Sequence, residues 1–537
     1  MAHSQHIADN ASTEACPQLN QPVSPTPYTV YTRNQKRRLR LLLGFATITS
    51  PLTATIYFPL LPLLRVHFNT SAQAINLTIT IYIIFQALSP AVFAPISDTL
   101  GRRLVYLVTL ALYTVGNLGL ALNKSSYVAL LTLRAIQSLG ASAALAISYG
   151  VVADICIPSE RGSMLGPVSM ALNLGACVGP VIGGAVAWTS GSYEWVFWSL
   201  VIVGVMLWFS VGLFLPETAR VLVGNGSPDA ERRCWEESWF ILIKRSLFDR
   251  NGKIETKERE SEHRGHGLMS SESSRKDISI LRQCRFVNPL ACLRVMFHRD
   301  TFFILWLQGS FYVVDYSVVA AMPDIYKDIY HFNELQIGLT YIPRGAGIIA
   351  AGYCIGKLMD YNYKTVATQI GWNIDEVAGD DLQHFPIERA RTRFSYLLLM
   401  LSTVVLIGYG WAVTKHAHLA VMLVLQFLQG SMGTSFYNTY NALLVDVFPE
   451  SPSTAAAAAS IVRCMMAAAG VAILQPLLDA LNRGWYFTIL GLWSGICGAL
   501  AVLMIERKGM RWRTQRIERR NAPRSAHSAG SGGSRTA

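Results

Sequence analysis

Residues 195–215 read WVFWSLVIVGVMLWFSVGLFL, a run without a single charged side chain. A helix rises 1.5 Å per residue, so about 20 apolar residues cross the hydrocarbon core of a bilayer. Eleven further stretches are long and apolar enough to do the same, and the alternation typical of a membrane β-barrel is absent. We therefore predict an all-α membrane protein with twelve transmembrane helices. The stretches are 39–64, 73–95, 104–122, 127–155, 164–188, 195–215, 301–322, 335–358, 394–413, 419–445, 455–481 and 485–505.

Composition and charge fit this prediction. Hydrophobic residues make up 51% of the chain and charged residues 15%, with a formal net charge of +12. In a soluble protein this balance would indicate nucleic acid as a partner, but here the basic residues largely avoid every second loop, as the positive-inside rule describes. We therefore expect a lipid bilayer around the chain, no nucleic-acid partner, and cytosolic termini. Of 46 Lys and Arg residues, the outer loops hold Arg65, Lys124, Lys327, Lys415 and Arg483.

The sequence gives no sign of enzyme chemistry. The nine cysteines show no metal-ligand spacing. The helices lack clustered His and Asp residues or a nucleophile constellation, and the pattern G-x(4)-G-K-[ST] of nucleotide-binding loops does not occur. We expect no enzyme activity, no metal and no cofactor, with a proton gradient rather than ATP as the energy source.

Three segments lie outside the apolar stretches and are expected to be cytosolic. Residues 1–38 read as a disordered tail that ends in a basic cluster at 33–40. The central segment, 216–299, includes an aromatic and basic stretch at 235–248 that is typical of a helix lying at the membrane interface. Residues 506–537 form a basic and then Ser- and Gly-rich tail, which we expect to be unfolded.

Polar and charged positions repeat between the two halves of the chain. This indicates two pseudo-symmetric six-helix bundles, 39–215 and 300–505, related by an axis along the membrane normal, as in secondary transporters that rock between two states. Two of the three matches have the same offset of 292 residues. The matched positions are Gln137 with Gln429, Asp154 with Asp446, and Asp98 with Asp360.

The decapeptide GACVGPVIGG at 175–184 is the most specific motif. Small residues let membrane helices approach closely, and proline permits a kink. Gly175, Gly179, Pro180, Gly183 and Gly184 fit the antiporter signature G-x(3)-G-P-x-x-G-G. Over roughly 39–506 the chain resembles the major facilitator superfamily, in particular its twelve-span drug:proton antiporter family. The resemblance implies the major facilitator fold.

Weaker matches are similar to the fungal quinidine-resistance-like branch of that family. They occur at the outer end of the first stretch, at the edges of the central segment, and in the tenth and eleventh stretches. The matching residues are Tyr57-Phe-Pro59-Leu-Leu-Pro62, Pro216-Glu217-Thr218, Asn288-Pro289-Leu290, Asn438-Thr-Tyr440-Asn441 and Arg463-Cys464.

The loop after the second stretch resembles the motif G-x(3)-D-x-x-G-R-R at Asp98, Gly101, Arg102 and Arg103, with Ala94 in place of the first glycine. A short basic loop with one carboxylate suits a gate whose ion pairs hold one conformation and break in the other. We expect a gating loop here, with Asp360 as its counterpart in the second half. A simple positive-inside anchor would explain the arginines but not the aspartate.

The fourth stretch resembles the family motif R-x-x-Q-G at Arg134 and Gln137, with Ser138 replacing the glycine. An arginine inside a spanning helix is costly and therefore a functional candidate. The resemblance implies that Arg134 and Gln137 take part in proton coupling. The alternative is that Arg134 pairs with a carbonyl or carboxylate only to hold the bundle together.

In the major facilitator fold the first, fourth, seventh and tenth helices line the central pathway. Aromatic faces with scattered amides suit bulky amphipathic substrates, although most aromatic residues in membrane helices only pack or anchor at the interface. Our candidates for substrate binding are Tyr57, Tyr312, Asp315, Gln429, Asn438 and Tyr440.

Asp315 and Arg344 are unusual charges in the seventh and eighth stretches. At 1.5 Å per residue both lie roughly 10–14 Å below the outer edge, on sequence-adjacent antiparallel helices. We therefore predict an ion pair, which would offset the cost of burying each charge. Asp315 is in addition a candidate for proton coupling, because its protonation would open the pair.

Together these features predict a proton-coupled antiporter that exports small organic molecules, such as drugs, toxins or a secondary metabolite, by alternating access. We expect a monomer in the fungal plasma membrane, with the vacuolar membrane as the alternative. Other transport functions remain open, namely polyamine export or nutrient import by the same fold. A non-transporting sensor is a further alternative, whose usual mark is a long signalling tail.

Overall fold

The computed structural model describes residues 29–156, 158–223, 238–240, 295–371, 385–448 and 452–529. Helices and short connections make up these ranges, with no strand among them. Several expectations therefore lie outside the described residues: those for 1–28, for most of the central segment with its interfacial stretch and Asn288-Pro289-Leu290, and for 530–537.

The first crossing is broken into short helices: α1 (Arg33–Thr47), α2 (Thr49–Thr55), the 3₁₀ helix η1 (Phe58–Leu60) and α3 (Leu61–His67). It begins at Arg33 because Thr32 forms a capping box with Gln35, accepting from the Gln35 amide at 3.4 Å while the Gln35 side chain accepts from the Thr32 amide at 2.8 Å. The predicted tail 1–38 is therefore too long, since its last residues are helical.

The remaining helices follow the predicted stretches. In the first half they are α4 (Ala72–Leu100), α5 (Arg102–Leu122), α6 (Tyr127–Ile155), α7 (Pro158–Ser190), α8 (Glu194–Phe214) and the short α9 (Arg220–Val223). In the second half they are α13 (Arg299–Tyr330), α14 (Glu334–Leu339), α15 (Tyr341–Gln369), α16 (Ile387–Thr392), α17 (Ser395–Thr414), α18 (Leu419–Val447) and α19 (Pro452–Ala529).

Ten helices among the described residues are long and apolar enough to cross a membrane. One of them, Thr454–Arg519, covers both of the last two predicted stretches, because α19 consists of two helices joined at Asn482 (φ 62°). The stretch 335–358 falls on α14 and α15, which are not among the ten. Every predicted stretch is thus mainly helical, and the prediction of an all-α protein is confirmed for the described residues.

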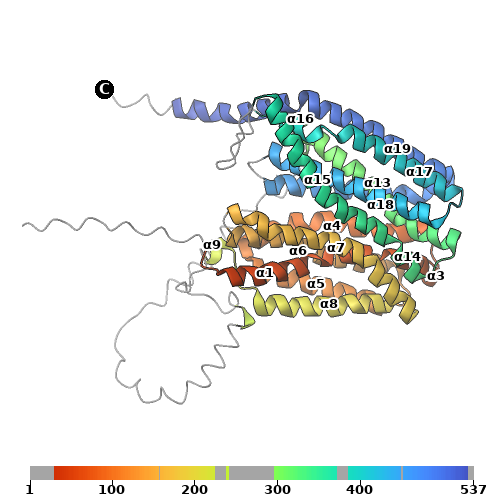
Figure 1. The fold of residues 1–537 in the computed structure, drawn as a ribbon. Coiled ribbons are helices and arrows are strands. Elements are labelled where there is room, and N and C mark those ends of the chain that lie inside the picture. Colours follow the sequence, from red (N-terminus) through yellow and green to blue (C-terminus); the bar gives the residue numbers. More distant parts are fainter. Residues whose placement is uncertain are drawn as a thin grey trace, which may run out of the picture.

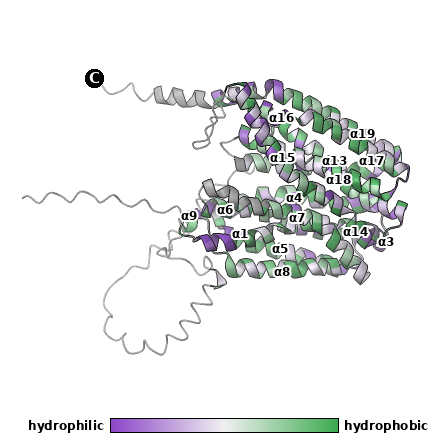
Figure 2. Cartoon of the chain, viewed as in Figure 1, coloured by the Kyte–Doolittle hydropathy of each residue, from purple (hydrophilic) through white to green (hydrophobic). Residues whose placement is uncertain are grey.

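The helices of each half lie together. Figure 1 shows the first half, red to yellow, as one layer and the second half, green to blue, as the other. Between the halves, α4 packs against α19, and α7 packs against α14 and α15. The start of α1 and the last turns of α19 lie at the same end of the molecule, which we call the terminal end; the opposite end is the far end. Figure 2 shows apolar helices with hydrophilic residues gathered at the terminal end, around α1 and α16.

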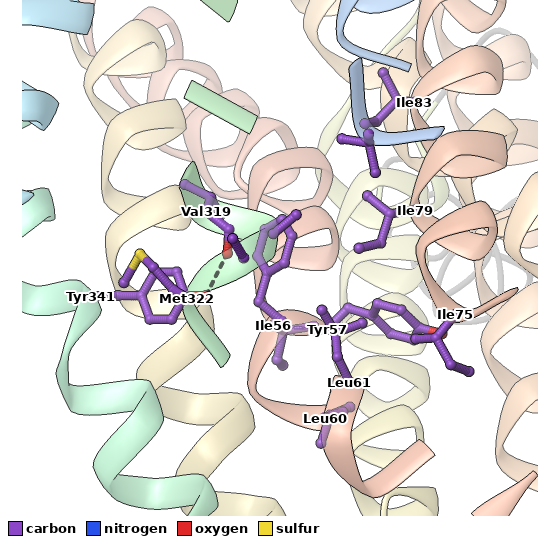
Figure 3. Packing of buried hydrophobic residues seen from close by; sticks show 14 of the residues in the cluster. Ile56, Tyr57, Leu60, Leu61, Ile75, Ile79, Ile83, Val319, Met322 and Tyr341 are labelled. Atoms are coloured by element: carbon purple, nitrogen blue, oxygen red, sulfur yellow. Dashed lines mark hydrogen bonds between the residues drawn. The ribbon is translucent and has the colours of Figure 1, made fainter. Parts of the chain in front are cut away.

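The apolar core differs between the two ends. One cluster of buried residues contains members of both halves and lies toward the far end. Figure 3 shows part of it, where Ile56 and Tyr57 lie between Ile79 of α4 and the Val319–Met322 segment of α13. The other two clusters each belong to a single half, one to residues 39–215 and the other to 295–505. Among the described residues, the halves therefore share an apolar core toward the far end, whereas each of the other two cores belongs to one half.

The C-terminal tail is helical where it is described. α19 continues through Glu506 to Ala529, so the expectation of an unfolded tail is wrong for these residues. Two arginines explain why. Arg513 Nε lies 3.2 Å from Glu388 Oε1, with both side chains 3% exposed, and Arg516 Nε lies 2.7 Å from Asp300 Oδ2. These ion pairs fasten the extension to the starts of the seventh and ninth crossings.

Candidate functional site

Arg134 lies two turns after the start of α6, with only 1% of its surface exposed. Its guanidinium carbon is 4.0 Å from the ring centroid of Tyr57 and 4.3 Å from that of Tyr82, and Nη1 donates to Gln137 Oε1 at 2.6 Å. Cation–π contacts of this kind stabilise a desolvated charge. Among the described residues Arg134 has no carboxylate partner, so two tyrosine rings and an amide surround it instead.

A hydrogen-bonded chain fixes this cluster to the neighbouring helices. Gln137 Nε2 donates to Asn117 Oδ1 at 2.6 Å, and Asn117 Nδ2 donates to the Tyr113 carbonyl at 2.8 Å. The hydroxyls of Tyr57 and Thr78 are 2.8 Å apart. Sequence reasoning found Arg134 and Gln137 but missed Tyr82 and Asn117, whose only signal was a polar group in an otherwise apolar helix.

The second half contains a similar arrangement around Arg463 of α19. Its guanidinium carbon is 4.7 Å from the ring centroid of Tyr312 and 4.9 Å from that of Tyr437. The Nε atoms of Arg463 and Arg134 both lack a hydrogen-bond partner within the described part of the chain. The sequence had marked Arg463 only as a similarity to one branch of the family. Each half thus carries one arginine between two tyrosine rings.

One face of α13 connects the two arginines. Tyr312, Asp315 and Tyr316 are spaced three and four residues apart and therefore share a helix face. The rings of Tyr312 and Tyr316 are 4.7 Å apart, and the Tyr312 hydroxyl donates to that of Tyr316 at 3.4 Å. Tyr316 is close enough to Arg134, in the other half, to interact with it electrostatically. The arginines and tyrosines therefore form one array across the interface between the halves.

Asp315 and Arg344 lie in contact, as the sequence predicted. Arg344 Nη2 forms an ion pair with Asp315 Oδ1, and the side chains are 8% and 25% exposed. Two glycines of α18 leave room for the pair. A Cβ at Gly433 would lie 3.4 Å from Asp315 Oδ1, and one at Gly430 would lie 3.0 Å from Arg344 Cγ. The aspartate is thus the more accessible partner.

The other candidates for substrate binding occupy different surroundings. Tyr57 is fully buried beneath Arg134, and Gln429 is 3% exposed with no partner for Oε1 among the described residues. Asn438 is partly buried. Tyr440 packs inside the second half, where its hydroxyl donates to Ser395 Oγ at 2.7 Å and its ring stacks on Phe436.

The gating loop depends on a glycine and a carboxylate. Gly101 has φ 107°, and a Cβ there would collide with the Glu217 carboxylate. Glu217 therefore reaches the start of α5, where it accepts from the amides of Arg102 at 2.8 Å and Arg103 at 3.1 Å. A carboxylate at this position satisfies free amides and complements the helix dipole. Sequence reasoning had recorded Glu217 only as part of a short family match.

The two arginines of the loop have separate partners. Arg102 forms an ion pair with Asp98, and its Nε lies 3.0 Å from Asp154 Oδ2. Arg103 is buried and donates from Nη2 to the Gly212 carbonyl at 2.9 Å. Arg102 is therefore the arginine of this pair that joins Asp98 and Asp154.

In the second half, Arg391 takes the place of Arg102. Its Nη2 lies 3.0 Å from Asp446 Oδ2, so the repeat of Asp154 as Asp446 extends to a shared arginine partner. The sequence comparison had matched the aspartates but missed Arg391. Asp360, the expected counterpart of Asp98, is exposed. Each of the ion pairs described at the terminal end joins residues of the same half.

The glycines of the antiporter motif serve two close contacts. Gly175, Gly179 and Gly183 face the first crossing, where a Cβ would run into the 48–56 segment. Gly184 faces the other half, and a Cβ there would collide with the Glu334 carbonyl of α14. In the same region the Pro180 carbonyl lies directly against Gly338. The motif thus brings the backbones of the two halves together near the far end.

Similarity to known proteins confirms the predicted major facilitator fold. The Major Facilitator Superfamily model matches residues 43–374. The MFS-type transporter phiD of a fungal species is 34% identical over 94% of this chain and 73% of its own length. Citrate exporter 1 of Aspergillus niger is 32% identical over 92% of this chain and 90% of its own length. Among solved structures, a partially occluded inward-open form of the xylose transporter XylE from E. coli has a TM-score of 0.57 at 15% identity, covering 88% of this chain and 97% of that one.

Proposed function

The chain belongs to the major facilitator superfamily, and we propose that it is a proton-coupled antiporter that exports small organic molecules by alternating access. The relatives with more than 30% identity are named as fungal transporters, not as enzymes. Transport by a multi-span membrane protein is the shared property. Proton coupling, the direction of transport and the class of substrate are the proposed part.

The observation that carries the proposal is the accessible carboxylate of Asp315 beside the buried guanidinium of Arg344. A proton taken up by Asp315 would remove its negative charge and free Arg344, so that the two protonation states favour different helix contacts. Arg134 supports the same mechanism, because a membrane-embedded arginine without a carboxylate partner in the described chain responds strongly to charges that arrive nearby.

The transporter family, its branch and the exported compound are proposed from the motifs and the relatives. We propose the drug:proton antiporter family and its quinidine-resistance-like branch, with a toxin, drug or secondary metabolite as the exported compound. Citrate exporter 1 is a relative named for export of a small organic molecule. We further propose a monomer in the plasma membrane, with cytosolic termini and without a cofactor. Residues 39–215 and 300–505 would be the moving halves, and 216–299 would connect them.

The test is proton-driven accumulation in inside-out membrane vesicles from cells that overproduce the protein. With the vesicle interior acidified and ATP omitted, an exported compound should accumulate and should leave when a protonophore collapses the gradient. A panel of organic cations, anions and neutral compounds, including citrate and a polyamine, identifies the substrate. Vesicles from cells that lack the protein give the background.

Several results would contradict the proposal. Accumulation that persists with the protonophore would exclude proton coupling. Accumulation only in right-side-out vesicles would indicate an importer, and no movement of any compound would favour a sensor. Preferred transport of the polyamine would support the polyamine exporter instead.

A further inference from the structure

Charges in the middle of the predicted membrane stretches are few and unequal in sign. Arg134, Asp315, Arg344 and Arg463 are the charged residues that lie more than one helical turn from both ends of a stretch. Three arginines and one aspartate leave two positive charges in excess. Burying an uncompensated charge in a membrane is costly, so these arginines are candidates for a functional role.

The three arginines are not equivalent. Arg344 is neutralised by Asp315. Arg134 is 1% exposed and enclosed by two rings and Gln137. Arg463 is partly exposed, and one of its two rings, Tyr437, is 40% exposed. Arg463 is therefore the unneutralised arginine that another molecule can reach most easily.

The surroundings of Arg463 suit a carboxylate. A guanidinium presents its N–H donors in the plane of the group, and this fork matches the two oxygens of a carboxylate. The rings of Tyr312 and Tyr437 stabilise the charge, and Tyr437 in addition forms a side-chain hydrogen bond with Arg463. Arg463 Nε is one donor without a partner among the described residues.

We propose that Arg463, held by Tyr312 and Tyr437, binds a carboxylate of the transported molecule, so that the substrates are organic acids. The proposal rests on the proposed export function and names its substrate class. The excess of two positive charges favours an anion and opposes a polyamine or another organic cation. Tyr312 and Tyr316 connect this site to Arg134, so the positive potential of both arginines acts on the same array.

The test compares three ligands of similar shape that differ in charge, with citrate as a second carboxylate compound. The full-length protein is purified into lipid nanodiscs, and its unfolding temperature is measured with 4-phenylbutyrate, 4-phenylbutanamide, 4-phenylbutylamine or citrate at neutral pH. A ligand that binds the folded state raises the unfolding temperature. The two carboxylate compounds should raise it, and the amide and the amine should not. Equal stabilisation by the amide or the amine, or none by either carboxylate compound, would overturn the proposal.

Variants assign the binding to the site. A charged hydrogen bond contributes enough that Arg463→Gln should weaken carboxylate binding roughly tenfold to a hundredfold. Arg463→Lys keeps the charge but loses the fork, so it should retain part of the affinity, and it replaces the Gln variant if that protein does not fold. Arg483→Gln, which removes an arginine from an exposed ion pair on the same element, is the matched control and should bind normally.

Undiminished carboxylate binding by Arg463→Gln, or by Arg463→Lys and Tyr437→Leu together, would overturn the assignment to Arg463. The measurement needs no proton gradient and no transport. If no carboxylate binding is found, the proposal of proton-driven export would still hold for a neutral or cationic compound. Normal binding without proton-driven accumulation would instead contradict the proposed antiport.

Discussion

Asp315 of α13 and Arg344 of α15 form an ion pair between neighbouring antiparallel helices, with Gly430 and Gly433 of α18 packed against it. The pair joins three helices of the second half at one point. It brings the carboxylate of Asp315 against a guanidinium, a group that has only hydrogen-bond donors.

Neutralising one partner should therefore impair the protein more than exchanging both. Asp315→Asn leaves Arg344 buried with an uncompensated charge, and loss of one partner of a buried pair costs up to about 3–5 kcal/mol, less here because Asp315 is partly accessible. The double variant Asp315→Arg/Arg344→Asp should recover part of the lost transport and unfolding temperature. Asp328→Asn, which breaks an exposed pair with Arg483, is the control. Full activity of Asp315→Asn and Arg344→Gln would contradict this role.

Arg134→Ala should abolish efflux while the protein still reaches the membrane. The substitution removes the charge from a site whose rings and amides remain, and expression is checked by fluorescence of a fused reporter. Arg134→Lys should also fail, because an ammonium cannot lie flat between Tyr57 and Tyr82 as a guanidinium does. Lys124→Gln, in an exposed loop of the same half, should transport normally. Normal efflux by Arg134→Ala would exclude a part in coupling.

Asp98→Asn should abolish efflux with little change in the stability of the protein. The Asp98 side chain is 52% exposed, so its ion pair with Arg102 contributes about 0–1 kcal/mol and its loss should hardly change the unfolding temperature. Efflux should nevertheless be lost, because Arg102 then keeps only the Asp154 carboxylate at the gate. Efflux and unfolding are measured on the same preparation. An unfolding temperature that falls together with efflux would instead indicate a structural role.

Gly179→Leu should disable export in a protein that still inserts. A side chain there would run into Thr55 and the backbone of the first crossing, so that α7 has to move away. Pro180→Leu is expected to act in the same direction by changing the path of the helix. Gly352→Leu is the matched control, because open space surrounds a Cβ at that glycine of α15. Equal transport by Gly179→Leu and Gly352→Leu would show that export does not depend on the contact of Gly179 with the first crossing.

Arg513→Gln should destabilise the second half. It leaves the buried Glu388 carboxylate without its partner, which is expected to lower the stability by roughly 3 kcal/mol. A chain that ends after Gly509 should show a loss at least as large, since the contact of Arg516 with Asp300 disappears as well. Arg511→Gln, an exposed arginine on the same helix, serves as control. Equal unfolding temperatures of the Arg513→Gln and Arg511→Gln proteins would show that the ion pair of Arg513 with Glu388 does not stabilise the second half.

The sequence predicted those features that depend on one helix or on two consecutive ones. The length of the apolar stretches predicted the membrane crossings. The equal depth of Asp315 and Arg344 on adjacent antiparallel helices predicted their ion pair. The rings around Arg134 and Arg463 were not predictable, since they come from helices that are not consecutive, and a single sequence does not say which helix faces which.

The helical extension was missed for a different reason. Its composition is polar, and polarity alone predicts a tail. The usable signal was the spacing of Arg513 and Arg516, three residues apart and hence on one face of a helix that can reach carboxylates of the bundle. Arg391 was missed because its distance along the chain from Asp446 gave no reason to pair them.

In the proposed alternating access, the close contact of Gly184 with Glu334 would be the point about which the two halves rotate. A helix as long as α6 measures about 43 Å, so a rotation of 10° about such a point moves its other end by roughly 7 Å. The ion pairs at the terminal end hold each half together as one unit, and each half has its own apolar core there. A rotation of this size about the glycine contact would open the terminal end by a distance comparable with the width of a small organic molecule.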